Sequence, residues 1–401
     1  MKTIFPFLAI LFLTTMQINA QQALWGGTPI VSPEVNSNKT VTFRFQAPNA
    51  DSVFITGDFL PTAKYDSQWG EIDIPGRAML EKDNNGTWSF TSAVLEPNLY
   101  SYSFIVDGLI TTDPNNVYKV RDVASVFDVF IVDGGIADLY KVNQVPHGSV
   151  TRCWYNSPTL EKQRRITIYT PPGYENNNEK YPVLYLLHGM GGDEEAWIAL
   201  GRTAQIIDNL IAQGKAQPMI VVMPNGNAAQ EAAPGESSLG MYKPTMQLPN
   251  TMDGTYENSF KDIISFVESN YRVKAEKSNR AIAGLSMGGF HSLHISRFYP
   301  NTFDYVGLFS AAIMPDENVK SKVYENFEET LTAQKKNGIQ LYWIAIGKTD
   351  FLYQANTDYR KKLDSLDFKY TYIETEGGHT WDNWRKYLSE FATQIFQSKK
   401  F

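Results

Sequence analysis

The spacing of apolar residues changes once along this 401-residue chain, near residue 150, and the change restricts the folds open to it. Before this point apolar and polar residues alternate in short runs, as they do in strands with one buried face. After it, continuous apolar runs are separated by stretches in which apolar residues recur every three or four positions. This second pattern is typical of a mostly parallel sheet covered by helices. We therefore predict an all-β domain followed by an α/β domain.

The first region contains short alternating runs separated by turn residues. Alternation is clear at 41–45, 52–56 and 100–106, and an Asp-Asn-Asn-Gly turn at 83–86 precedes a run at 87–90. Regular short runs without helical periodicity are typical of a β-sandwich. We predict a small immunoglobulin-like sandwich over residues 21–140 and a linker over 141–150, where Val-Pro-His-Gly interrupts the pattern.

The second region, residues 151–401, alternates strands with helices. Phe260, Ile263, Ile264 and Val267 fall on one face of a helix, which is therefore amphipathic. The alternation predicts a mostly parallel sheet covered on both sides by helices. The apolar strand candidates are residues 165–169, 183–187, 219–223, 281–283, 305–310, 341–346 and 370–373.

A serine lies between two glycines where one of these strands meets a helical pattern. Gly284 and Gly288 flank Ser286 in the run Gly-Leu-Ser-Met-Gly. A sharp strand-to-helix turn has no room for a Cβ at the outer positions, and it exposes the serine hydroxyl at the sheet edge. The run predicts a nucleophile elbow, although a Gly-rich turn that merely begins a helix has the same short sequence.

A nucleophilic serine needs a base, and the chain offers five histidines: His147, His188, His291, His294 and His379. In α/β-hydrolases the order is serine, acid, histidine, so only the last three remain. His291 and His294 lie on the helix that the elbow begins, and we expect them to be packing or surface residues. His379 lies in a loop after the last strand, where such folds carry their chemistry, and is the predicted base.

The acid is expected after the preceding strand. Asp350 directly follows the strand candidate at 341–346 and is the predicted acid. Glu374 and Glu376 are weaker alternatives because they lie so close to His379, at the end of the strand that precedes it. A helix N-cap is the non-catalytic interpretation of Asp350.

Acyl transfer also needs two backbone N–H donors for the oxyanion. The residue after the nucleophile, Met287, is predicted to supply one of them. The second donor is expected from the Gly-rich turn after an early strand, Leu-His-Gly-Met-Gly-Gly at 187–192, where Met190 is the best placed residue.

Four motifs together resemble the esterases of carbohydrate esterase family 1, which holds feruloyl and acetylxylan esterases. They are Val-Pro-His-Gly at 145–148, the Gly-rich turn at 187–192, Gly-Leu-Ser-Met-Gly-Gly at 284–289 and Gly-His-Thr-Trp at 378–381. The resemblance covers about residues 145–400 and implies an α/β-hydrolase fold, with the same roles for Ser286, Asp350, His379, Met190 and Met287. It implies neither a metal nor an organic cofactor.

The first region is similar to early-set sandwich modules related to glycogen-binding domains. The similarity is carried by the run at 100–108 and by Asp-Pro-Asn at 113–115. It implies a carbohydrate-binding module in which Trp69 or Trp88 stacks on sugar rings. The favoured interpretation is that these tryptophans fill the sandwich core and that the module orients the catalytic domain.

Residues 1–20 have the charge and apolar core of a secretory signal, with cleavage expected after Ala20. No cysteine adjoins that point to carry a lipid, and no later run reaches the length of about 20 apolar residues that a membrane span needs. We expect a periplasmic or secreted protein. The only cysteine, Cys153, excludes an intramolecular disulfide and is predicted to be structural. A net charge of -7 without Lys/Arg clusters argues against nucleic-acid binding.

Together these features predict a serine esterase for feruloyl esters on plant cell-wall arabinoxylan, whose partners are esterified polysaccharides or oligosaccharides. Met241, Tyr242 and Met252, within a long loop at 225–255, and Trp381 are the predicted substrate-binding residues. An acetylxylan esterase is the main alternative. A siderophore esterase, a peptidase and a non-catalytic carbohydrate-binding protein are further alternatives.

Overall fold

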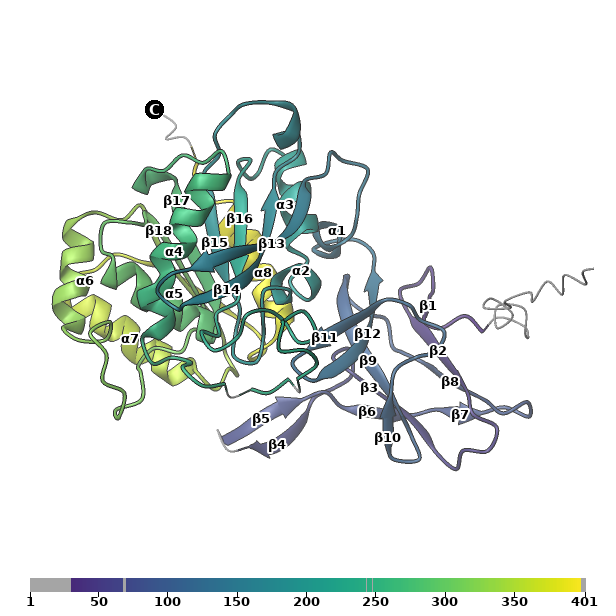
Figure 1. Ribbon diagram of the computed structural model, residues 1–401. Coiled ribbons are helices and arrows are strands. Elements are labelled where there is room, and N and C mark those ends of the chain that lie inside the picture. The colour runs from purple at the N-terminus through teal and green to yellow at the C-terminus, as the bar shows by residue number, and fades with distance from the viewer. Residues whose placement is uncertain (1–29, 68–69, 243, 247, 398–401) are drawn as a thin grey trace, which may run out of the picture.

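The computed structural model describes residues 30–67, 70–242, 244–246 and 248–397. An all-β part lies beside an α/β part (Figure 1), as predicted. The predicted signal, residues 1–20, and Trp69 lie outside the described residues. None of the helices in the described ranges combines the length and the hydropathy that crossing a bilayer requires.

The all-β part consists mainly of two antiparallel sheets. One sheet has the strand order β1-β2-β8-β7, and the other has the order β11-β12-β9-β3-β6, with β10 paired to β9; β4 and β5 form a separate hairpin. The strands are β1 Glu34–Val35, β2 Val41–Gln46, β3 Val53–Gly57, β4 Ala63–Ser67, β5 Gly70–Ile74, β6 Arg77–Met79, β7 Glu81–Lys82, β8 Thr87–Thr91, β9 Asn98–Val106, β10 Leu109–Thr111, β11 Lys119–Asp122 and β12 Ser125–Val132.

The two larger sheets enclose a core of alternating apolar residues. Phe43 of β2 and Ile55 of β3 are fully buried in it, together with Phe104 of β9. Trp88 is only 4% exposed, and its indole N–H donates a hydrogen bond to the Ala47 carbonyl at 2.9 Å. Trp88 is therefore a core residue, and the structure excludes the sugar-stacking role for it.

Eight strands form the sheet of the α/β part, in the order β13-β14-β16-β15-β17-β18-β19-β20. The strands from β16 to β20 run parallel, whereas β13 and β14 are antiparallel to their neighbours. Every predicted strand is present. The strands are β13 Ser149–Ser157, β14 Lys162–Thr170, β15 Val183–Leu187, β16 Ile220–Pro224, β17 Arg280–Leu285, β18 Tyr305–Phe309, β19 Leu341–Gly347 and β20 Thr371–Thr375.

Helices cover both faces of this sheet, which is why β15, β16 and β18 are buried along their whole length. Helices α4 and α7 pack on one face, and α3 and α8 pack on the other. The helices are α1 Ala137–Tyr140, α2 Ala196–Ala199, α3 Thr203–Ala212, α4 Thr255–Asn270, α5 Met287–Phe298, α6 Phe327–Lys336, α7 Tyr353–Ser365 and α8 Trp381–Ala392.

The sandwich is attached to the face that carries α8. Leu99 of β9 and Tyr140 of α1 are buried in the same apolar cluster as α3 and α8. Arg385 of α8, 3% exposed, donates hydrogen bonds to the carbonyls of Leu99 at 3.0 Å and Leu200 at 3.1 Å. One buried guanidinium therefore joins the two parts, and β11 and β12 lie on the side of the sandwich nearest the α/β part (Figure 1).

Candidate active site

Ser286 occupies a strained turn between β17 and α5. Its backbone has φ 53° and ψ -115°, a conformation that costs a residue with a side chain about 1–3 kcal/mol. A Cβ on Gly284 would collide with the backbone of Gly288, and a Cβ on Gly288 would collide with the carbonyls of Leu187 and His188. The turn is held by a hydrogen bond from the Ser286 N–H to the Phe309 carbonyl at 2.9 Å. Positions 284 and 288 therefore leave no room for a Cβ, as predicted from the sequence.

The predicted acid and base are in direct contact. His379 Nδ1 lies 2.9 Å and 3.1 Å from the two carboxylate oxygens of Asp350. Since an ionised carboxylate only accepts hydrogen bonds, Nδ1 carries the hydrogen and Nε2 is left free to accept a proton. Asp350 also accepts the Leu352 N–H at 2.9 Å, and Leu352, not Asp350, is the N-cap residue of α7.

Aromatic rings hold the imidazole of His379 on two sides. Phe351 lies 4.5 Å from it between ring centroids, and Trp384 of α8 meets it edge-on at 4.9 Å. The His379 side chain is 18% exposed and the Asp350 side chain is fully buried. The pair is therefore shielded from water on the Asp350 side and open on the other.

The elbow and the Asp350–His379 pair belong to one edge of the sheet. Ser286 follows β17, Asp350 follows β19 and His379 follows β20, and these strands are parallel. The Ser286 hydroxyl and the His379 ring, both within the described residues, are not hydrogen-bonded to each other. Such contacts are often long in a free enzyme and shorten with bound substrate.

The Gly-rich turn lies against the elbow. The Gly192 N–H bonds the Gly189 carbonyl at 3.1 Å, and Gly191 has φ 76°, so Met190 and Gly191 are the central residues of a type II turn. A methyl group on Gly189 would lie 3.4 Å from the Cβ of Ser286. We call residues 189–192 the oxyanion turn. Met190 is half-buried in this turn, and Met287 begins α5, where N–H groups have no partner within the helix.

His188 anchors the oxyanion turn through hydrogen bonds of its ring. Its Nδ1 lies 2.7 Å from the Gly189 carbonyl, and its Nε2 accepts the Gly226 N–H at 2.7 Å. These bonds need a neutral ring that donates from Nδ1. Burial, more than any other factor, lowers the pKa of His188 from 6.5 to about 4. The histidine excluded as the base therefore connects the oxyanion turn to the loop after β16.

The remaining histidines bond other partners than Asp350. His147 is paired with Asp208 at 3.1 Å. His291 bonds Glu257 at 2.8 Å, and both side chains are fully buried. His294, also buried, bonds the Ile313 carbonyl at 2.9 Å. His291 and His294 are packing residues, one of the two roles expected for them.

The loop residues predicted to bind substrate lie in different surroundings. Met241 is 91% exposed. Tyr242 donates its hydroxyl to the Ala232 carbonyl at 2.6 Å, and burial raises its pKa to about 12. Met252 is half-buried and has φ 56°. Contact of these residues with substrate stays a prediction.

Trp381 has a packing role. It begins α8 and meets Trp197 and Trp384 edge-on, at centroid distances of 5.3 Å and 5.2 Å. Trp384 in turn contacts the His379 ring, so a single side chain separates Trp381 from the predicted base. Trp381 therefore supports a ring that packs on the predicted base, and any contact with substrate stays a prediction here too.

Two residues beside the oxyanion turn were absent from the predicted site. A Cβ on Gly191 would lie 2.7 Å from Val123 of the sandwich and 2.7 Å from the sulfur of Met246. Met246 lies in the long loop at 225–255. The sequence predicted that this loop contacts substrate, but it did not single out Met246 within it. Nothing local in the sequence connects Val123 with the oxyanion turn.

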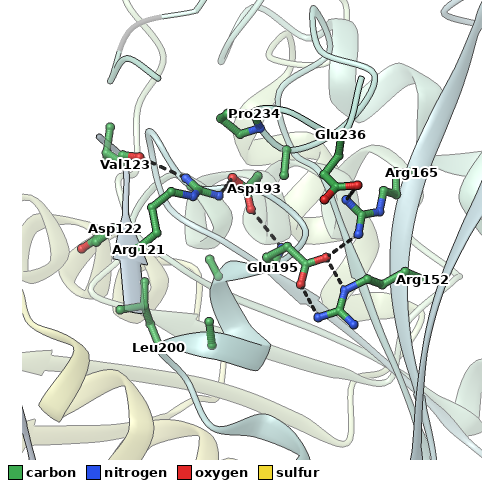
Figure 2. A pocket seen from close by; sticks show the side chains of 14 residues that line it. Arg121, Asp122, Val123, Arg152, Arg165, Asp193, Glu195, Leu200, Pro234 and Glu236 are labelled. Atoms are coloured by element: carbon green, nitrogen blue, oxygen red, sulfur yellow. Dashed lines mark hydrogen bonds and ion pairs between the residues drawn. The ribbon is translucent and has the colours of Figure 1, made fainter. Parts of the chain in front are cut away.

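A charged cavity of about 490 Å³ lies between the sandwich and the α/β part (Figure 2). The sandwich contributes Arg121, Asp122 and Val123 to its lining. On the other side, Arg152 forms two 2.7 Å hydrogen bonds with Glu195. The residues that line it do not include Ser286, Asp350 or His379, so it is a separate space at the interface.

Neither a cysteine nucleophile nor a metal site is supported among the described residues. Cys153 of β13 is half-buried, and burial raises the pKa of its thiol, which makes it a poorer nucleophile. In the described part of the chain no three His, Cys, Asp or Glu side chains are grouped so that they could hold a metal ion.

Comparison with known proteins identifies esterases. Residues 157–395 match the family described as "Putative esterase". A Xylanibacter ruminicola protein named endo-1,4-beta-xylanase/feruloyl esterase is 28% identical over 376 residues, which are 91% of this chain and 46% of that protein. The chain thus spans about half the length of this relative.

Two further proteins support the same family. An acetyl esterase of Caldicellulosiruptor saccharolyticus is 26% identical over 242 residues, 53% of this chain and 82% of that protein. A solved ferulic acid esterase is 28% identical, with a TM-score of 0.51, over 62% of this chain and all of its own chain (100%). The resemblance to feruloyl and acetyl esterases is confirmed.

The neutral state of His188 predicts a pH dependence of stability. Its pKa is about 4 in the folded protein and 6.5 ordinarily, so between these values the unfolded chain binds a proton that the folded protein does not. The free energy of unfolding should therefore fall by up to about 3 kcal/mol from this group as the pH drops from 6.5 to 4. In His188→Gln this component is absent.

Urea unfolding of both proteins at several pH values measures this component. The variant should be less stable near pH 7, because it loses one of the two hydrogen bonds, and the difference should narrow towards pH 4. Parallel pH profiles for the two proteins would contradict a neutral, buried His188.

Proposed function

Because the chain belongs to the "Putative esterase" family, we propose that it is a serine carboxylic ester hydrolase with Ser286 as nucleophile, His379 as base and Asp350 as acid. The observation that carries this proposal is the bond from His379 Nδ1 to the Asp350 carboxylate, at the sheet edge that also bears the elbow. A buried carboxylate that orients an imidazole has the required effect: it leaves Nε2 as the proton acceptor.

In the first half of the reaction, Nε2 of His379 takes the hydroxyl proton as Ser286 Oγ attacks the ester carbonyl carbon. The carbonyl oxygen becomes an oxyanion, which accepts hydrogen bonds from the N–H groups of Met190 and Met287. When the intermediate collapses, the C–O bond to the alcohol breaks and His379 gives that alcohol its proton. Ser286 is left acylated.

In the second half, water replaces the alcohol. His379 takes a proton from water as its oxygen attacks the acyl carbon, and the same two N–H groups stabilise the second oxyanion. Collapse releases the acid and returns the proton to Ser286 Oγ. Asp350 stays ionised throughout and stabilises the protonated imidazole. No metal or organic cofactor takes part in this scheme.

For the substrate we propose a hydroxycinnamoyl ester, feruloyl in the first place, on plant cell-wall arabinoxylan. The names of the Xylanibacter ruminicola relative and of the solved ferulic acid esterase support this choice. The thioether of Met246 beside Gly191 gives the edge of the oxyanion turn an apolar surface, which suits an aromatic acyl group.

An acetyl ester is the second candidate. The observation in its favour is the acetyl esterase of Caldicellulosiruptor saccharolyticus, of which the chain matches 82%. The two candidates differ in the size of the acyl group, and therefore in how much apolar surface the loop at 225–255 must supply.

We further propose that residues 1–20 are a cleaved secretion signal and that the enzyme acts outside the cytoplasm on esterified polysaccharides or oligosaccharides. The charged start and the apolar core of this segment support the proposal. For the sandwich, residues 21–140, we propose that it orients the catalytic part. Its Trp88 is buried and therefore cannot stack on a sugar ring.

Ser286→Ala should lower kcat on 4-nitrophenyl acetate and methyl ferulate on the order of a million-fold, because the acylated residue is lost. Ser296→Ala is the matched control. Ser296 lies on α5, the helix that follows Ser286, and is 1% exposed. Among the described residues its hydroxyl bonds only the Leu293 carbonyl, so kcat should stay within about threefold of wild type. Undiminished hydrolysis by Ser286→Ala would refute the mechanism.

Asp350→Asn should lower kcat about 10⁴-fold, because an amide at this position donates to Nδ1 and forces the imidazole hydrogen onto Nε2. Glu376→Gln tests the alternative acid and serves as control. Glu376 is paired with Lys348 at the surface, and its loss should change kcat less than about threefold. A larger loss in Glu376→Gln than in Asp350→Asn would move the acid to position 376.

Initial rates on feruloylated arabinoxylan oligosaccharide, acetylated xylan and a siderophore lactone test the substrate. We expect the highest kcat/KM for the feruloylated oligosaccharide, because the aromatic acyl group buries apolar surface that acetate lacks. A higher kcat/KM for acetylated xylan would select the acetylxylan esterase, and a higher value for the lactone the siderophore esterase.

A further inference from the structure

Three consecutive residues of the sandwich reach the catalytic part. β11 ends at Asp122 and β12 begins at Ser125, and the tip of this hairpin carries Arg121, Asp122 and Val123. Each of the three contacts a different position around the proposed site. Through them the tip touches both the oxyanion turn and the helix that follows His379.

Arg121 pairs with the residue that directly follows the oxyanion turn. Its guanidinium forms an ion pair with Asp193, which directly follows Gly192 and is 3% exposed. Arg121 is held in turn by a 3.0 Å hydrogen bond from its Nη1 to the Val123 carbonyl. Figure 2 shows Arg121 and Asp193 meeting at the cavity. A buried carboxylate that loses its partner charge is costly, so this pair fixes the position of Asp193.

Asp122 points to the other side of the strand, as alternation along β11 requires. Burial raises the pKa of Asp122, and an interaction of its carboxylate with the Trp381 side chain opposes that rise. Trp381 packs on Trp384, and Trp384 packs on the ring of His379. A contact from the sandwich therefore reaches the base through two indole rings.

Val123 completes the contacts of the tip. It has φ 50°, which is unusual for a β-branched residue and is kept only where the surroundings determine it. A Cβ added to Gly191 would lie 2.7 Å from the Val123 side chain, so the two residues are in close contact. The oxyanion turn is thus packed by the sandwich at Gly191, the residue that follows Met190.

We propose that Arg121 and Asp122 are positioning residues that hold the oxyanion turn and the His379 imidazole in their relative places across the interface. The proposal rests on the proposed triad and oxyanion donors. Its physical basis is that a displacement of about 1 Å in such groups costs about a hundredfold in rate. The oxyanion turn follows β15 and the loop of His379 follows β20, and the tip of the β11–β12 hairpin links the two.

The alternative is that these are ordinary interface contacts. Partly exposed ion pairs contribute at most about 1 kcal/mol to stability, and their loss would leave kcat unchanged. The interface also has independent anchors in the buried Arg385 and in a 2.6 Å bond between Asn98 and Asp382. Stability and turnover should therefore respond differently to changes at the tip.

The test is kcat and KM for 4-nitrophenyl acetate, a substrate too small to engage a polysaccharide-binding surface, in the full chain. Arg121→Gln, which keeps a polar side chain, should lower kcat about tenfold or more with KM within about threefold. Arg121→Lys should recover most of the loss, because the ion pair can reform. Asp122→Ala, which leaves the ion pair intact, should also lower kcat.

Arg44→Gln is the matched control. Arg44 lies in the sandwich, its side chain is 32% exposed like that of Arg121, it pairs with Glu34 at 2.7 Å, and it bonds the Val31 carbonyl at 2.9 Å. Its kcat should equal that of wild type. Wild-type kcat in both Arg121→Gln and Asp122→Ala, or an equal loss in Arg44→Gln, would overturn the proposal.

The outcome for Ser286→Ala separates this proposal from the one on which it rests. If Ser286→Ala is inactive and the Arg121 and Asp122 variants match wild type, only the positioning role fails. If Ser286→Ala keeps its activity, the proposed catalytic mechanism fails first. Near-UV circular dichroism shows whether each variant folds. If one does not, kcat is compared between Arg121→Lys, which keeps the charge pair, and Asp193→Asn, which removes it. A lower kcat in Asp193→Asn supports the proposal, and equal kcat in the two variants overturns it.

Discussion

The close approach of Gly284 to the backbone of Gly288 is the constraint on which the catalytic part depends. Because neither residue has a Cβ, β17 can turn directly into α5, and α5 can pack against the carbonyls of Leu187 and His188 at the end of β15. The same contact brings the oxyanion turn beside Ser286. A larger residue at either glycine would separate the nucleophile from the N–H groups that serve it, whatever the state of Asp350 and His379.

A second constraint operates across the interface. The sandwich shares an apolar cluster with α3 and α8 and is fixed there by Arg385. Since α8 begins two residues after His379, the surface that carries the sandwich is also the support of the base. The tip of the β11–β12 hairpin extends this support to the oxyanion turn. The sandwich thus belongs to the framework of the proposed site.

Local patterns predicted most of the architecture. The change from alternating to continuous apolar runs located both parts, and the apolar face of α4 was identified from Phe260, Ile263 and Val267, all buried. These predictions work because burial on one or two faces is recorded in residues close in sequence. The role of Trp88 could not be decided in this way, since an exposed and a buried indole have the same local pattern.

The sequence by itself determined the candidate nucleophile, acid and base. Chain order leaves three histidines after Ser286, two of them lie on the helix that follows it, and Asp350 directly follows the strand before the last one. Only the tertiary structure decided that Asp350 and His379 touch, that His188 is a neutral anchor, and that Val123 and Met246 flank Gly191. Arg121 and Asp193 lie 72 positions apart. No periodicity or short motif connects residues at such a separation, since their contact arises only when one domain packs on the other.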